Sequence, residues 1–437
     1  MRKYITLLML LVALIPLKSY SQSSTNALTE KSSLKLSLSE AQRIAIEENK
    51  TLQNASYDVL KAKASRWQAI ATMLPQITAK GDYSNMCGYS MTFGQGMTIS
   101  MPPSGQLTLT TSIALSGVQV IATQIARLSM DMADITKAKT EQQIAEQVKG
   151  IYYSILVTEE TQKLLEKNLV NLKDVYKITL SSVKAGVQEE IEADKISVQV
   201  ITMENTIVST KRSKEMALNS LRLLLDLKVD TPIELIQSID DLINIKLALS
   251  LSAEPFVLES NYDYQLLQKN TILSHKNVSS TAWAYGPSLS VFHQYTKKKY
   301  FSDEGGFNMT PPNMIGISIS VPIFSSFSRY KALKVAKINY SKQLNTLEQT
   351  ENSLKIQHSQ LVYNLKTSYD SYKAQKKNVK VSEKVFQNVS KKYDYGTASS
   401  LEICTANTSL IQAQTTYVSS LLNFINAQIE LEKLLNK

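Results

Sequence analysis

The sequence is poor in glycine, histidine and cysteine, and each shortage excludes a class of protein. Only 13 of the 437 residues are glycine, which is about 3% against a usual share of roughly 7%. Folds with many tight turns and glycine-rich phosphate loops are therefore disfavoured, and long helices are favoured. Three histidines and two cysteines leave little material for a transition-metal site or a disulfide framework.

Catalytic patterns are also missing from the sequence. We find no nucleophile with a neighbouring base, no pair of carboxylates at catalytic spacing and no phosphate-binding loop. The sequence therefore predicts a protein that is not an enzyme and that needs no cofactor or metal.

The first 21 residues have the layout of a secretory signal peptide. Arg2 and Lys3 precede an apolar run at 5–17, and the small residues around Ser21 suit cleavage before Gln22. That run is too short for a confident membrane span, and no other stretch approaches 18 uninterrupted apolar residues. We therefore expect 1–21 to be removed and the mature chain to be exported without a transmembrane helix. The net charge of +10 would suit nucleic acid, but export argues against that partner.

An internal duplication runs through the mature chain at an offset of 396 − 186 = 210 residues. Gly186 and Glu192 of the first half align with Gly396 and Glu402 of the second. Each glycine follows a long helical pattern and is expected to reverse the chain through a left-handed cap. The sequence thus predicts two structural repeats.

Each repeat is expected to contain a short helix, two strands, a long helix and a returning helix. A seven-residue apolar spacing on a polar background, as at Leu333, Tyr340 and Leu347, is typical of coiled coils. The opening helix is expected at 37–73. The other expected bounds are as follows: first repeat 22–226, with strands at about 76–86 and 106–116 and helices at about 118–184 and 190–226; linker or equatorial segment 227–262; second repeat 263–437, with strands at about 287–297 and 314–323 and helices at about 325–394 and 400–436.

The four predicted strands have the pattern of membrane-spanning strands. In the last one, Ile315, Ile317 and Ile319 alternate with small or polar residues. Each strand has about ten residues, enough to cross a bilayer at a tilt with one face toward lipid and one toward water. Four strands are too few to close a barrel, and unpaired edges in lipid are costly. At least two chains must therefore combine their strands, and the strand pattern leaves their number open.

Two smaller features lie in the predicted loops between the strands. Lys297-Lys298-Lys299 is expected to be a solvated charge run in an outer loop, with contact to lipopolysaccharide phosphates as the alternative. Cys87 is expected at the outer end, more than about 100 Å from Cys404 by helix length, so no disulfide is predicted.

The chain resembles the TolC-like outer-membrane efflux protein family over nearly all of its mature length. The residues that carry the resemblance are Leu36-Ser37-Leu38-Ser39-Glu40-Ala41; Leu74-Pro75-Gln76-Ile77; Val321-Pro322-Ile323-Phe324 with Arg329; Tyr393-Asp394-Tyr395-Gly396 with Ser400-Leu401-Glu402-Ile403; and Gln412-Ala413 with Tyr417.

The resemblance implies a mainly α fold with a small β part and an outer-membrane location in a Gram-negative cell. It implies a homotrimer whose twelve-stranded β-barrel, set in outer-membrane lipid, continues into a long periplasmic α-helical coiled-coil barrel. It also implies a passive exit duct for small molecules or proteins, working with a periplasmic adaptor (membrane fusion) protein and an inner-membrane pump in efflux or type I secretion. The alternative is a periplasmic coiled-coil adaptor or structural protein without a pore, which would have no need of the four strands.

The resemblance also implies a constriction at the periplasmic tip. By position it assigns the pore-facing acids to Glu402 and Glu192, with Glu190 and Asp194 adding negative charge nearby; solvated helix-tip acids are the alternative. Tyr393 is expected either to hold the closed tip or to pack in the coiled-coil core. The chain departs from the family pattern at Ala398 and Thr405, where relatives carry a gate arginine and a second acid, so a gate lock here would be weaker or built differently.

Overall fold

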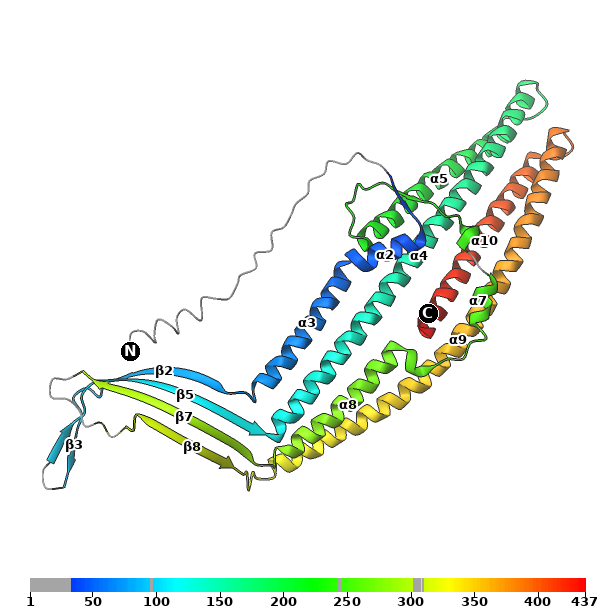
Figure 1. The fold of residues 1–437 in the computed structure, drawn as a ribbon. Coiled ribbons are helices and arrows are strands. Elements are labelled where there is room, and N and C mark those ends of the chain that lie inside the picture. Colours follow the sequence, from blue (N-terminus) through cyan, green and yellow to red (C-terminus); the bar gives the residue numbers. More distant parts are fainter. Residues whose placement is uncertain (1–32, 95–96, 243–244, 302–307, 309) are drawn as a thin grey trace.

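The computed structural model describes residues 33–94, 97–242, 245–301, 308 and 310–437. The predicted signal peptide at 1–21 lies outside these residues. The described chain is mainly helical and strongly elongated, with a small sheet at one end and two helical hairpin tips at the other (Figure 1). Within the described residues, no helix is long and apolar enough to span a membrane.

One antiparallel sheet contains strands from both repeats. It consists of β2 (Gln76–Ser84), β5 (Ser104–Ser116), β7 (Ser288–Tyr300) and β8 (Asn313–Ser320), in the order β2-β5-β7-β8. β5 of the first repeat pairs with β7 of the second along the full length of both strands, from Ser104↔Tyr300 to Ser116↔Ser288. The two repeats are therefore joined by a continuous ladder of backbone hydrogen bonds.

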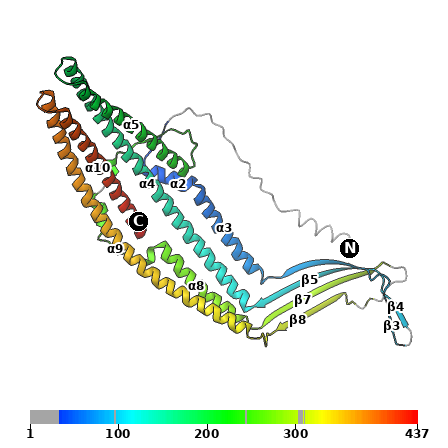
Figure 2. The ribbon, with the colours of Figure 1, turned by 180° about the vertical axis from the view of Figure 1, so that it is seen from behind.

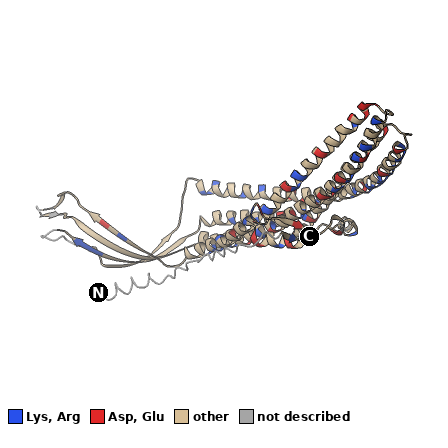
Figure 3. Ribbon diagram, turned by 90° about the horizontal axis from the view of Figure 1, so that it is seen from above, with Lys and Arg blue, Asp and Glu red and all other residues tan. Residues whose placement is uncertain are grey.

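The register places most of the apolar residues of the four strands on one face of the sheet, whereas Phe292 and Met314 lie on the other. Leu109 lies between Ala79 and Tyr295, and Val291 lies beside Ile317. Because side chains alternate along a strand, their neighbours in sequence occupy the opposite face. That face is mostly polar, with Thr108 and Thr110 in β5 and Ser318 in β8. Figure 3 shows few charged residues in the sheet and many of both signs along the helices.

Two predictions for the outer end of the sheet need correction. The predicted loop at 87–105 contains a two-stranded hairpin, β3 (Ser90–Phe93) and β4 (Met97–Ser100). The lysine run 297–299 lies within β7 and not in a loop, because its residues continue the ladder with β5. Beyond the run, the backbone N–H of Phe301 donates to the Pro103 carbonyl at 2.8 Å. Cys87 and Cys404 are both unpaired.

Each repeat combines one long helix with two shorter ones placed end to end (Figures 1 and 2). In the first repeat, α4 (Gly117–Lys184) is flanked by α3 (Lys50–Ala71) near the sheet and by α5 (Glu190–Leu224) near the tip. In the second repeat, α9 (Ser328–Asp394) is flanked in the same way by α8 (Tyr262–Trp283) and α10 (Ser400–Leu435).

The opening helix predicted at 37–73 is two helices, α2 (Leu38–Glu48) and α3, and Asn49 is the break between them. Asn49 has an extended backbone and is only 6% exposed. Its side-chain oxygen accepts from the Thr51 N–H at 2.9 Å and caps α3, while its Nδ2 donates to the Leu224 carbonyl at 2.9 Å. The break is required because the C-terminus of α5 meets the N-terminus of α3 at this point.

The second repeat has the same capping arrangement between its two short helices. Asn261 caps α8 by accepting from the N–H groups of Asp263 and Tyr264, and its Nδ2 donates to the Leu434 carbonyl at 3.4 Å. Leu224 and Leu434 differ by the repeat offset of 210 residues. Both repeats therefore join their two short helices through one buried asparagine.

The linker packs against the middle of the helices. Its strand β6 (Ile233–Leu235) pairs in parallel with β1 (Leu34–Leu36), and it continues through α6 (Ile239–Leu242), α7 (Ile245–Leu251) and the 3-10 helix η1 (Leu258–Ser260). The two largest cores lie at this level, one around Tyr152 and one around Phe424, and both side chains are fully buried. The middle of the molecule is thus its best-packed part.

Candidate functional site at the helical tips

The two hairpin tips reverse the chain with the same geometry. Gly186 and Gly396 have φ values of +72° and +70°, which suit glycine because a Cβ is disfavoured in the left-handed region. At the first tip, the N–H groups of Gly186 and Val187 donate to the carbonyls of Val183 and Ser182, each at 2.9 Å. The second tip repeats both bonds. These are the paired bonds of a Schellman motif, which ends a long helix with its last carbonyls satisfied.

Glu402 lies in an ordinary helix cap at the second tip. Its carboxylate accepts from the backbone N–H of Ser399 at 2.7 Å, and the Ser399 hydroxyl in turn accepts from the Glu402 N–H, forming a capping box. The Ser399 backbone N–H bond lowers the pKa of Glu402, with the Ser399 hydroxyl as the next cause. The exposed Glu402 carboxylate therefore stays ionised near neutral pH.

Glu192 occupies the matching position at the first tip but has different neighbours. It accepts a hydrogen bond from the hydroxyl of Ser400, the first residue of α10, and forms an ion pair with Lys195 at 2.8 Å. Its side chain is 26% exposed. Glu192 therefore connects the two tips, because its partner Ser400 lies two residues before Glu402 in the second tip. Glu190 and Asp194 lie on the first turns of α5 and are exposed.

Tyr393 is buried at the tip, with 4% exposure, and belongs to a small apolar cluster. Its hydroxyl lies within hydrogen-bond distance of the Thr179 hydroxyl and donates to the Gln188 Oε1 at 3.3 Å. Thr179 is on α4 and Gln188 is in the loop that follows it, so Tyr393 connects the second repeat to the first. We call the buried members of this set the tip cluster: Leu172, Val175, Ile196, Phe386, Tyr393, Ile403, Cys404, Ala406 and Leu410.

Within the chain, the partners of Tyr393 are a hydroxyl and an amide. Ala398 packs against the tip cluster and supplies no charge. Thr405 is exposed, and its hydroxyl donates to the Leu401 carbonyl of its own helix. Within one chain, the two hairpin tips are therefore joined by the hydrogen bonds of Tyr393 and by the contact between Glu192 and Ser400.

Sequence reasoning missed Ser400, Thr179 and Gln188. Thr179 could have been found from the sequence. It follows Leu165 and Leu172 at seven-residue spacing, so it is a polar residue at a position where the heptad pattern predicts a buried apolar one. The roles of Ser400 and Gln188 could not have been predicted, because their hydrogen-bond partners lie more than 200 residues away in the sequence.

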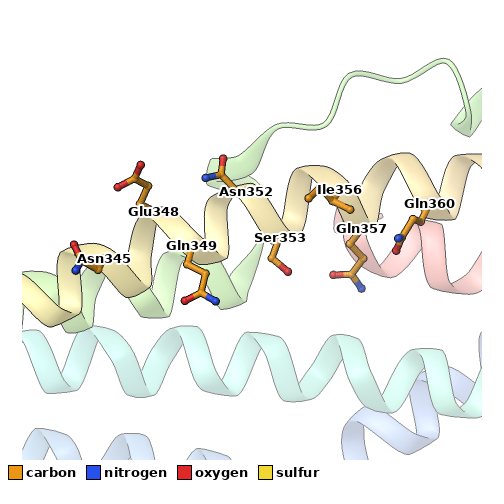
Figure 4. Close-up of a pocket in the computed structure, with 8 residues that line it drawn as sticks. All are labelled: Asn345, Glu348, Gln349, Asn352, Ser353, Ile356, Gln357 and Gln360. Atoms are coloured by element: carbon orange, nitrogen blue, oxygen red, sulfur yellow. The ribbon is translucent and has the colours of Figure 1, made fainter.

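A surface hollow lies elsewhere, along the middle of α9. It has a volume of about 890 Å³ and is lined mainly by uncharged amides, including Gln349, Asn352 and Gln357 (Figure 4). Its one carboxylate is Glu348, and its one hydroxyl is that of Ser353. Within the described residues, no group of three histidine, cysteine or acidic side chains could hold a metal ion. The hollow therefore offers a mainly uncharged polar surface.

The solved structures with the same fold include outer-membrane channels. CusC is 16% identical, with a TM-score of 0.75 over 94% of this chain and 95% of that chain. VceC from Vibrio cholerae is 14% identical, with a TM-score of 0.74 over 91% and 95%. The open state of MtrE from Neisseria gonorrhoeae is 18% identical, with a TM-score of 0.72 over 91% and 88%. A search of curated proteins found no match.

The model of the family described as "Outer membrane efflux protein" matches residues 42–226 and 258–437. These two segments correspond closely to the two repeats and leave out most of the linker. Because the match covers most of the chain, the chain belongs to the outer membrane efflux protein family, as a TolC-like protein of the outer membrane that extends into the periplasm.

Proposed function

We propose that this chain is the outer-membrane channel subunit of a tripartite efflux or type I secretion system. The observation that carries the proposal is the four-stranded sheet, in which β2 and β8 each pair along one edge only among the described residues. In lipid, each unpaired backbone group costs several kcal/mol. Two open edges of eight or nine residues would therefore cost tens of kcal/mol, more than a typical domain's stability.

Further copies of the chain remove that cost by pairing β8 of one copy with β2 of the next. Three copies give twelve strands, which is within the range of closed membrane barrels. The apolar face then meets lipid, where Ile315 is already 77% exposed, and the polar face lines a water-filled passage.

The helices support the same assembly. On α5, exposed apolar residues recur at seven-residue spacing in two series, Ile191 with Val198 and Ile201 with Val208. Val198 is 62% exposed in the single chain. A heptad seam without a partner is the surface that a coiled coil buries against another helix. A neighbouring copy supplies that helix in a closed helical barrel.

In the assembled trimer, the tips gather around one axis and form the periplasmic constriction. Three copies of Glu402 and of Glu192 would make this opening favour cations. Glu402 is held by its own helix cap, whereas Glu192 is held by Ser400 across the two tips. Opening the tip would therefore free Glu192 and leave Glu402 in place. A periplasmic adaptor and an inner-membrane pump would supply the energy and the cargo.

The test is reconstitution of the purified protein in planar bilayers. A detergent-resistant trimer that conducts cations in preference to anions is expected. The Glu402→Gln and Glu192→Gln variants should lower that preference, whereas Glu47→Gln, an exposed acid of α2 paired with Arg43, should not. A soluble monomer without conductance would refute the channel and favour the pore-free adaptor.

A further inference from the structure

The strand register places two lysines on the apolar, lipid-facing side of the sheet. Lys297 and Lys299 continue the two-residue series of Leu289, Val291, His293 and Tyr295 along β7, so all six share one face. Lys298 lies on the opposite face, where its Nζ is 4.8 Å from the centre of the Tyr300 ring. The run of three cations is therefore divided, with two toward lipid and one toward the passage.

The two lysines lie where the apolar band of the barrel ends. From Ser288, at the helical end of the sheet, to Lys297 is 297 − 288 = 9 residues. At about 3.3 Å per residue and a tilt of about 40°, these residues rise about 23 Å, close to the roughly 25 Å height of such a band. Because the helices leave the sheet at the Ser288 end (Figure 1), Lys297 and Lys299 lie at the outer border of the membrane.

The neighbouring strands place two aromatic rings beside the lysines. Lys299 pairs with Gly105, and Gly105 pairs with Tyr83, so the middle position of this cross-strand row has no side chain of its own. The Phe301 ring occupies that position, because a Cβ added to Gly105 would lie 3.1 Å from it. The Tyr83 and Phe301 ring centres are 6.0 Å apart. Aromatic rings at this depth are typical of the interface between hydrocarbon and headgroups.

No described acid neutralises the pair. Asp82, the nearest acid in the described part of β2, lies on the other face and pairs with Lys80 at 2.9 Å. Lys297 and Lys299 are two residues apart on one face, so their Cα atoms are about 7 Å apart. Two ammonium groups this close at the edge of hydrocarbon repel each other, and an anion between them removes the repulsion.

We propose that Lys297 and Lys299 bind the phosphate of a phosphorylated glycolipid in the outer leaflet. The lipid's acyl chains would lie along Leu107 and Val291, and its headgroup would rest on the Tyr83 and Phe301 rings. The inference rests on the proposed function in one respect only, that this face of the sheet meets the outer membrane and not a protein partner.

The experiment measures lipid binding to the purified full-length trimer by native mass spectrometry, with bisphosphorylated lipid A and dephosphorylated lipid A as probes. The Lys297→Gln/Lys299→Gln variant should lose about 10- to 30-fold in affinity for the bisphosphorylated lipid. Lys298→Gln, the same charge change on the other face, should bind like the wild type. Lys297→Arg/Lys299→Arg keeps both charges and should also bind.

Several outcomes would overturn the site. They are equal binding by the double glutamine variant, an equal loss in Lys298→Gln, and equal affinity for the dephosphorylated lipid. Displacement by millimolar inorganic phosphate would show a site for free anions and not for lipid. Conductance measurements separate this proposal from the proposed channel function. If the double glutamine variant forms a conducting trimer and still binds the lipid, only the lipid site is refuted. If the wild type forms no trimer and does not conduct, the channel function is refuted.

Discussion

Replacing Glu146 by glutamine should stabilise the protein above neutral pH. Glu146 is on α4 near the C-terminal turn of α10, and its Oε1 is buried without a hydrogen-bond partner among the described residues. Burial raises its pKa to about 7; Lys433 and Lys149 oppose the shift, and Glu430 and Glu432 add to it. Lys149 and Glu432 pair with each other, so neither is free to neutralise Glu146.

The direction of the pH effect follows from the two pKa values. The folded protein holds the Glu146 proton with a pKa of about 7 and the unfolded chain with the ordinary 4.5. Stability therefore falls as pH rises from about 4.5 to 7 and is constant above that range. At 1.36 kcal/mol per unit of pKa, the full difference between the two pKa values would lower the free energy of unfolding by about 3 kcal/mol. Because the residue as a whole is only half-buried, solvent screening reduces this to about 1–2 kcal/mol.

The assay is thermal unfolding of the detergent-solubilised trimer, followed by helical circular dichroism at pH 5.5 and pH 8. The wild type should melt about 1–4 °C lower at pH 8, and Glu146→Gln should lose most of that difference by melting higher at pH 8. Glu141→Gln, an exposed acid one and a half turns earlier on the same helix, should keep the wild-type difference. An unchanged pH dependence in Glu146→Gln would refute the reasoning.

Three further predictions concern the tip and the middle of the helices. Tyr393→Phe removes a hydroxyl from Thr179 and should weaken the closed tip by about 1 kcal/mol, raising single-channel conductance; unchanged conductance would leave Tyr393 a packing role only. Gly396→Ala should destabilise by about 1–2 kcal/mol in urea unfolding because of its positive φ. Gly150→Ala, within α4 and with no atom near the added Cβ, should instead stabilise by up to about 1 kcal/mol. Asn49→Ala should cost about 1–2 kcal/mol and increase amide exchange at the start of α3; exchange confined to other segments would contradict its capping role.

The sequence predicted the long helices better than the break between the short ones. The heptad spacing placed the long helices at 118–184 and 325–394, beside the observed Gly117–Lys184 and Ser328–Asp394. Such patterns are local and repeat many times, so a single sequence contains them. The break at Asn49 was not predicted, because it depends on a carbonyl 175 residues away.

The tip shows the same limit. The offset of 210 residues made Glu192 and Glu402 equivalent in sequence, yet Glu402 caps its own helix and Glu192 bonds to Ser400 of the other repeat. The end of β7 likewise depends on its pairing with β5, and this pairing cannot be predicted from the alternation of residues within β7. Contacts between distant segments decided each difference.

The two asparagine joints are braced by the linker. At the level of Asn49 and Asn261, α4 and α9 run through without interruption, while every flanking helix ends. The two largest cores lie at the same level, and they pack linker residues against α4 and α9. The linker therefore replaces the stiffness that is lost where the short helices end, so that a sideways load on the tips is carried past the joints and not absorbed there.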